Sequence, residues 1–151
     1  MPNVQSSYTE NMSAARVGQI ANEEPSTLIS REVQTAAITF GKVVKQGTAD
    51  RQIQAATAAV DVYRGITVRD RSVNPATPEG WAVNETCRVM TKGVIWVTAG
   101  ATVAAGAAVY MVVGTGQAGN FTSVSASNLA IPNAIFESSG TVGTLVRIRL
   151  N

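Results

Sequence analysis

The chain has 151 residues, of which 45% are hydrophobic and only 15% are charged, against about 25% charged residues in typical soluble domains. This hydrophobic content excludes disorder throughout, and the length indicates one domain, or one domain with an appendage. The formal net charge is +2 and aromatic residues make up 5%, so the composition argues against a nucleic-acid partner. A surface with so few charges is typical of a protein whose faces are covered by copies of itself or by another protein.

Residues 1–33 are predicted to form an N-terminal arm. Residues 1–26 are polar and irregular, and a structureless segment of this length is uncommon inside a compact domain. Capping-box spacing allows a short helix over residues 9–20, although a glycine weakens it. The arm carries four acidic and two basic residues, and we expect it to order on a partner; a flexible tail without a role is the alternative. Its candidate anchors are the apolar residues Met12, Val17 and Ile20.

The β domain is predicted to span residues 34–151, although strand-like runs begin already at Thr27. In the first part of the chain, short β-branched runs are separated by glycines, and the run before the polar loop alternates as a half-buried strand does. A polar loop with Pro75 and Pro78 follows these runs and is predicted to be exposed. The predicted strands are Thr27–Val33, Ala36–Val44 with an interruption at Phe40-Gly41, Gln52–Thr57 and Arg64–Asp70, and the loop is Arg71–Gly80.

The stretch Gly93–Val113 holds two β-rich runs and no group placed for chemistry, so we interpret it as the framework of the domain. Predicted strands in this part are Trp81–Met90, Val94–Thr98, Ala107–Val113, Phe121–Val124, Ala134–Glu137 and Thr144–Leu150, with turns at 91–93, 114–120 and 138–143 and a loop at 128–133. In the last strand, Val146, Ile148 and Leu150 share one face and two arginines share the other. Strands at about 8–12-residue spacing without amphipathic helices predict an all-β fold, a small sandwich or a barrel.

Groups that carry chemistry are scarce in this sequence. There is no histidine, which removes the commonest general base and zinc ligand. The single cysteine, Cys87, excludes an internal disulfide framework, and its apolar surroundings predict a buried thiol. The pattern Gly114–Gly119 matches G-x-G-x-x-G, but strand chemistry follows where a nucleotide site needs a helix. Asp61 and Glu85 have no spacing that favours a catalytic pair, so neither an enzyme nor a metal or cofactor site is predicted.

The start of the sequence lacks the basic and apolar regions of a secretory signal. No apolar run approaches the roughly 20 residues that cross a bilayer. We therefore expect a chain made in a cytosol, without a membrane partner.

Several runs resemble the structural cement proteins of tailed-bacteriophage capsids. These runs are Tyr63–Arg71 (YRGITVRDR), Trp81–Asn84, Val89–Val97, Val103–Tyr110, Ala134–Glu137 and Val142–Ile148. The resemblance implies a small β domain on the outside of the capsid lattice of major capsid protein, acting as a homodimer or homotrimer, with an arm that reaches neighbouring subunits. It implies no catalytic residue, cofactor or direct contact with nucleic acid, and a location on the capsid exterior of a virion made in the host cytoplasm.

The leading hypothesis is therefore a capsid decoration protein that stabilises the shell. The candidate contact residues are Tyr8, Met12, Val17, Ile20, Arg69, Arg71 and Trp81. The alternative is a carbohydrate-binding module displayed on a virion or cell surface, for which Trp81 and Trp96 could serve as sugar-stacking platforms, although tryptophans more often fill a core or an interface.

Overall fold

The computed structural model of the chain describes residues 15–70, 79–114 and 116–151. The described residues form strands and no helix, which confirms the all-β prediction. The strands are β1 (Thr27–Val33), β2 (Ile38–Thr39), β3 (Val43–Gln46), β4 (Gln52–Ala55), β5 (Tyr63–Thr67), β6 (Gly80–Trp81), β7 (Thr86–Thr98), β8 (Ala108–Met111), β9 (Phe121–Thr122), β10 (Leu129–Phe136) and β11 (Leu145–Leu150).

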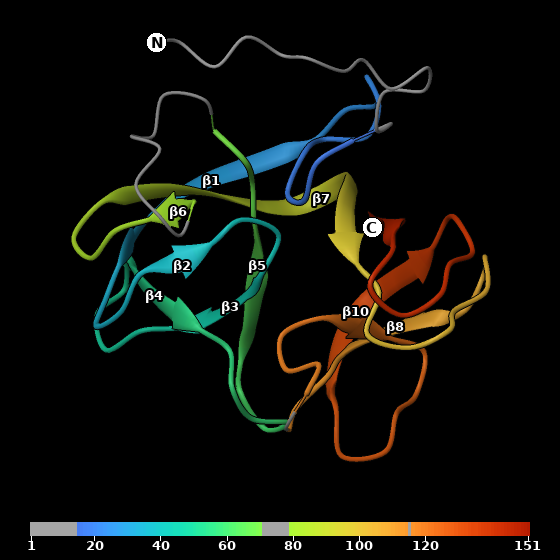
Figure 1. The fold of residues 1–151 in the computed structure, drawn as a ribbon. Helices are drawn as coiled ribbons and strands as arrows, with labels where there is room; N and C mark the ends of the chain where they lie inside the picture. The colour runs from blue at the N-terminus through green and yellow to red at the C-terminus, as the bar shows by residue number, and fades with distance from the viewer. Residues whose placement is uncertain (1–14, 71–78, 115) are drawn as a thin grey trace, which may run out of the picture.

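Nine of these strands form one sheet in the order β1-β4-β3-β5-β7-β11-β10-β8-β9, and β2 pairs with β6 separately. Strand β1 is parallel to β4 and also antiparallel to β7. The first half of the sheet is therefore a small barrel, formed by strands β1, β4, β3, β5 and β7. The second half consists of strands β7, β11, β10, β8 and β9, and Figure 1 shows the two halves side by side.

Strand β7 belongs to both halves. Its residues 86–92 pair with β1, and its residues 93–98 pair with β11. The turn predicted at residues 91–93 is therefore wrong, because the strand continues through it. Gly93 has φ +128° and its missing side chain leaves room for Ser26, so this glycine is a bend within a strand. In Figure 1, β7 crosses above the first half and then turns down into the second half.

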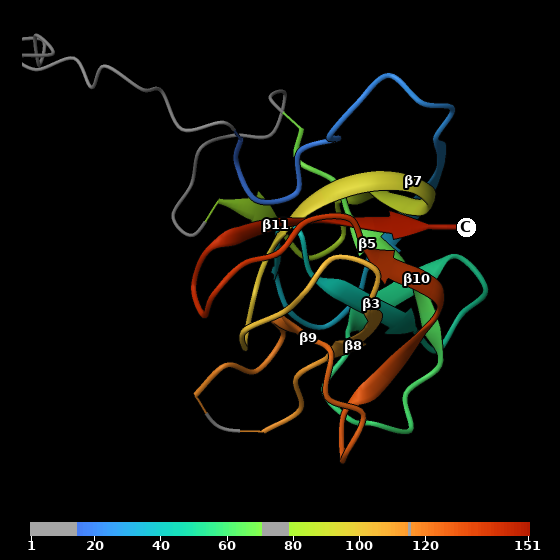
Figure 2. The same cartoon turned by 90° about the vertical axis from the view of Figure 1, so that its right-hand side faces the viewer.

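The end of the chain combines a confirmed and a wrong prediction. The hairpin of β10 and β11 forms as expected, with Ala134 opposite Leu150 and alternate residues of β11 buried. The loop predicted at residues 128–133 is instead the start of β10. Proline fits there because the pairing of β10 with β8 is interrupted between Ala130 and Ile135, which leaves no ladder hydrogen bond for its missing N–H. Figure 2 views this side of the molecule.

Two clusters of buried side chains fill the fold. The smaller cluster lies in the first half and includes Val33, Ile53 and Cys87, each fully buried. The larger cluster joins strands of both halves, and Ile66, Phe121 and Phe136 are fully buried in it. The larger cluster is therefore a core that the two halves share.

Residues that the sequence analysis assigned to the arm take part in this sheet. Thr27–Val33 is strand β1 of the barrel, as its β-branched pattern predicted. Residues 15–20 contain a turn and a β-bridge in place of the helix allowed by the sequence. How residues 1–33 act as an arm stays a prediction, and residues 1–14 lie outside the described part of the chain.

Candidate functional site

The candidate site is the place where the N-terminal segment joins the β domain. A groove of about 510 Å³ lies here, and we call it the root groove. It collects side chains from segments far apart in the sequence, and two of the predicted contact residues are among them. Its lining residues are Arg16, Val17, Thr39, Phe40, Lys42, Arg69, Glu79, Thr98, Gly143 and Leu145.

Backbone hydrogen bonds fix the N-terminal segment along β7. The Gly18 N–H donates to the Trp96 carbonyl at 2.8 Å, and the Trp96 N–H donates to the Gln19 carbonyl at 2.9 Å. The Ala21 N–H donates to the Val94 carbonyl at 2.9 Å. Residues 18–21 therefore act as a short additional strand beside β7.

Two glycines allow the segment to lie this close to the domain. Gly18 has φ +78°, and a Cβ there would lie 2.8 Å from the backbone nitrogen of Gly41. Gly41 has φ +68°, and a Cβ there would lie 2.5 Å from Val17. Both positions require glycine for two reasons, because the backbone is left-handed and because no space exists for a side chain.

A stack of three side chains lies at the root groove, and two of them, Arg69 and Phe40, line it. The Arg69 guanidinium lies over the Phe40 ring at 5.2 Å from its centroid. The Trp81 ring meets Phe40 edge-on, with centroids 6.0 Å apart. The stack connects an arginine at the surface to the buried core of the first half, which holds the cation in one place.

Charges around the root groove are mostly positive. Arg69 pairs with Glu79 at 2.6 Å, and Arg16 is exposed. The Lys42 ammonium donates to the Asn120 side-chain oxygen at 2.9 Å and to the Gly119 carbonyl at 3.3 Å. Burial lowers the pKa of Lys42. Such a groove favours a partner surface that carries acidic or neutral polar groups.

A second cluster of charges fixes the chain just after residue 21. Arg149 on β11 donates to Glu24 at 2.5 and 2.9 Å, and it also pairs with Glu137. These two carboxylates raise the pKa of Arg149, with Glu24 as the larger cause, and the hydrogen bond from Arg149 lowers the pKa of Glu24. Of the two arginines that share the outer face of the last strand, Arg149 therefore ties the segment to β11.

The structure distributes the predicted contact residues unequally. Val17 and Arg69 line the root groove. Ile20 is half-buried, packs on the larger core cluster and forms a β-bridge with Ile95. Trp81 is only 5% exposed, so little of its ring is available to a partner. Tyr8, Met12 and Arg71 lie outside the described residues, and the role of all seven residues as capsid contacts stays a prediction.

Sequence reasoning missed Phe40 and Lys42, which line the groove. Their neighbour Gly41 was noted as an interruption of a strand, and an isolated glycine in a strand pattern does signal close approach of another backbone. That signal identifies residue 41 as a place where another backbone comes close. It does not identify residue 18 as the segment that approaches, because the two are 23 places apart in the chain.

The carboxylates considered for catalysis make structural contacts, and the single thiol is buried. The Asp61 carboxylate accepts hydrogen bonds from Thr57 and Ala58, and the Glu85 carboxylate accepts one from Ala82. Asp70 pairs with Arg88 at 3.5 Å. Cys87 is fully buried, as predicted, and burial raises the pKa of its thiol to about 12.

No group of three His, Cys, Asp or Glu side chains within residues 15–70, 79–114 and 116–151 could hold a metal ion. In the same part of the chain there is no helix of the length and hydropathy that a membrane crossing requires. The hypothesis of a carbohydrate-binding module is not favoured. Trp81 is buried, and the Trp96 ring is covered by the Arg147 guanidinium at 5.6 Å.

Comparison with known proteins identifies the family. The family described as structural cement protein (E217 gp24/Pam3 gp6) matches residues 4–151. A chain from the capsid of Myoviridae phage XM1 has a similar fold, with a TM-score of 0.77 and 19% identity over 99% of this chain and 98% of that chain. The head fiber gp8.5 N base in bacteriophage phi29 is less similar, with a TM-score of 0.50 and 11% identity over 84% of this chain and 95% of that chain.

No curated protein matches the chain. The two solved structures are distant in sequence and show only the fold. That fold agrees with the barrel and the second half of the sheet described above. The family match is different in kind, because it covers nearly all of the 151 residues. The chain therefore belongs to the structural cement protein family.

Proposed function

We propose that this chain is a cement protein that binds the outer surface of the major capsid protein lattice of a phage and stabilises the shell. The single observation that carries the proposal is the family match over residues 4–151. The similarity of fold to a chain of the phage XM1 capsid supports it. On this reading the protein resides on the capsid exterior after synthesis in the host cytoplasm.

The proposed role is mechanical and involves no catalysis. In the described part of the chain, Asp61 and Glu85 accept structural hydrogen bonds. The root groove combines three cations with apolar side chains in its lining, which makes it suited to contact with a protein surface. The low charge content supports homodimers or homotrimers on the lattice, because such faces are covered by neighbouring copies.

The arm is proposed to reach a neighbouring capsid subunit. Because residues 18–21 are hydrogen-bonded along β7, a linked segment that precedes them would stay at high local concentration near the docked domain. A weak contact made by the arm therefore adds to the attachment without being strong by itself.

The test is binding of the full chain to capsids that lack it. We expect co-sedimentation with empty capsids and an increase in the temperature at which the shells break. Deletion of residues 1–14 is the informative truncation, since deletion of residues 1–26 would also remove the hydrogen bonds of Gly18 and Ala21 to β7. We expect the shorter deletion to leave the domain folded and to weaken binding. Full-length protein that does not bind capsids would contradict the proposed function.

A further inference from the structure

The loop between β4 and β5 displays its side chains in an unusual way. Val60 is 89% exposed and Val62 is 65% exposed, which makes them the most exposed large hydrophobic residues in the described part of the chain. Between them Asp61 points inward, with only 13% of its side chain exposed. Surface loops normally expose the carboxylate and cover the valines, so this loop has the opposite arrangement.

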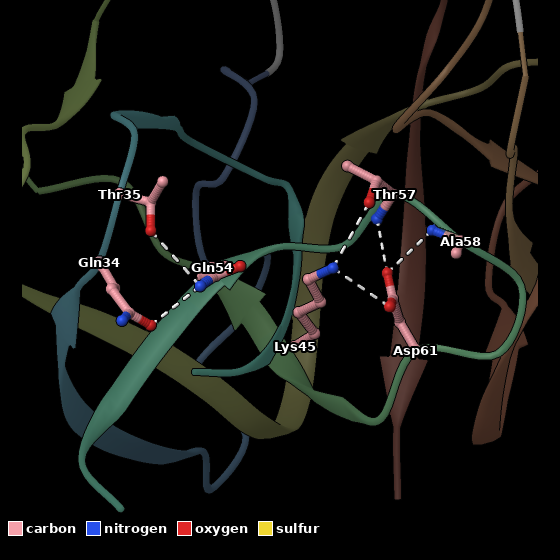
Figure 3. A network of polar contacts seen from close by, with 7 residues as sticks. All are labelled: Gln34, Thr35, Lys45, Gln54, Thr57, Ala58 and Asp61. Atoms are coloured by element: carbon pink, nitrogen blue, oxygen red, sulfur yellow. Dashed lines mark hydrogen bonds and ion pairs between the residues drawn. The ribbon is translucent and has the colours of Figure 1, made fainter. Parts of the chain in front are cut away.

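The inward carboxylate gives the loop a defined shape. One oxygen of Asp61 accepts the Thr57 and Ala58 N–H groups at 2.7 and 2.8 Å. The other oxygen accepts the Lys45 ammonium at 3.2 Å, and the same ammonium donates to the Thr57 hydroxyl at 3.4 Å. Figure 3 shows Thr57, Ala58 and Lys45 gathered around the Asp61 carboxylate. The valines are therefore displayed on an ordered loop, which reduces the entropy lost when they bind.

The surface that the valines form carries no net charge. Asp61 is the only charged residue between Gln52 and Tyr63, and Lys45 neutralises it. Beside the loop lies a groove of about 300 Å³ whose lining includes Ala55, Ala56, Thr57, residues 111–113 and one cation, Lys42. The valine surface of the loop itself is complementary to an uncharged, apolar depression in a partner.

The loop lies away from residues 15–21, and the groove beside it shares Thr39 and Lys42 with the root groove. In both views of the fold the loop is at the lower end of the molecule, whereas residues 15–21 are at the upper end. A protein that holds a shell together needs contacts at separate places, because a single contact leaves the neighbouring subunit unrestrained. The two ends provide two such places with different chemistry.

We propose that loop 57–62 is a second attachment point, which inserts Val60 and Val62 into an uncharged, apolar depression on a capsid subunit, so that one molecule grips the shell at both of its ends. This inference rests on the proposed function and adds to it the residues and the chemistry of one contact. The geometry that supports it is the exposed valine pair on an ordered, neutral loop at the end of the molecule opposite residues 15–21.

The test replaces both valines of the full chain by threonine, V60T/V62T, which keeps the branched shape and exchanges one methyl group of each side chain for a hydroxyl. The matched control is V83T/V124T, at valines that are 41% and 52% exposed on other loops. We expect V60T/V62T to weaken binding to empty capsids about tenfold, as the loss of two buried methyl groups implies. The control is expected to bind as the wild type does, and all three free proteins to unfold at the same temperature.

The outcomes separate this inference from the proposed function. If the wild type binds capsids and V60T/V62T binds equally well, the attachment at the loop is overturned and the proposed function stands. If V60T/V62T changes the mass of the free protein in light scattering and keeps its capsid affinity, the valines contact a second copy, which also overturns the inference. If the wild type itself does not bind capsids, both fail.

Discussion

The two ends of the molecule are built by different interactions. At the root groove, a whole segment is held by backbone hydrogen bonds to β7, by two glycines that remove steric barriers and by the stack of Arg69 on Phe40. At loop 57–62, one carboxylate provides most of the side-chain contacts that define the shape. The first arrangement depends on many groups, and the second depends on one.

This difference bears on how each end responds to change. Backbone pairing and close packing at the root groove do not depend on ionisation, and the ion pair of Glu24 with Arg149 adds to them a few residues further along the chain. The loop depends on a charged group whose partner, Lys45, is partly exposed, so it can be loosened without unfolding the domain. Predictions that address one end at a time therefore test whether the two ends are independent.

The largest effect is expected for Phe40→Ala. The Phe40 ring is buried between Arg69 and Trp81, and truncation of a buried phenylalanine costs about 3–5 kcal/mol in the free energy of unfolding. Urea unfolding measures the loss. Val62→Ala at the other end is the control and is expected to change the free energy by less than about 0.5 kcal/mol. Equal effects of the two substitutions would contradict the contrast between the ends.

The next largest loss of unfolding free energy is expected for Gly18→Ala, which tests the close approach of the N-terminal segment to the domain. Gly106→Ala is a matched control, since Gly106 has φ +88° and a Cβ there would meet nothing within 4 Å, whereas the Cβ at Gly18 would meet Gly41 at 2.8 Å. The left-handed backbone alone costs roughly 1–3 kcal/mol in either variant. We therefore expect Gly18→Ala to lower the free energy of unfolding more than Gly106→Ala. A smaller loss for Gly18→Ala would show that the segment detaches easily.

Much of this fold could be predicted from the sequence, because period-two patterns and glycine punctuation report local structure. The boundaries of β1 and the alternation in β11 follow from their side chains. The turn assigned at residues 91–93 was wrong because a glycine in a continuous strand has the same sequence signature as a glycine in a turn. The start of β10 was missed because its proline lies in a gap in the pairing.

The candidate site was predictable only in part. Val17 and Arg69 were identified separately and the structure brings them into one groove. Trp81 was proposed as a contact, yet it is buried under Phe40 because β6 pairs with β2. The pairing of Asp61 with Lys45 could not be inferred, since Lys45 lies on β3, 16 residues earlier in the chain. Contacts of this kind are set by the register of the sheet, and local sequence does not specify that register.

The third effect is expected for Asp61→Ala at the loop. The substitution leaves the Thr57 and Ala58 N–H groups without their acceptor and Lys45 without its carboxylate. Loss of these hydrogen bonds lowers the free energy of unfolding by about 1–2 kcal/mol. Hydrogen exchange gives the sharper readout, with faster exchange at Thr57 and Ala58 and unchanged exchange at Gly18 and Ala21. Faster exchange at both ends would mean that the two ends are coupled.

The smallest effect is the pH dependence that Asp61 adds. Burial raises the pKa of this carboxyl, but the hydrogen bonds from Thr57, Ala58 and Lys45 outweigh it, so the pKa is below its ordinary value. A carboxylate with a lowered pKa stabilises the fold fully above the ordinary value of about 3.9, and the stabilisation is lost as the pH falls through the lower, folded value. The difference in unfolding free energy between the wild type and Asp61→Ala should therefore be constant from pH 7 to about pH 5 and should decrease below about pH 4.

Gly18→Ala provides the control for this pH dependence, because its difference from the wild type involves no titrating group and should stay the same over this range. If the Asp61→Ala difference were also constant down to pH 3, the loop would be held by contacts other than the carboxylate, and the contrast between the two ends would not hold.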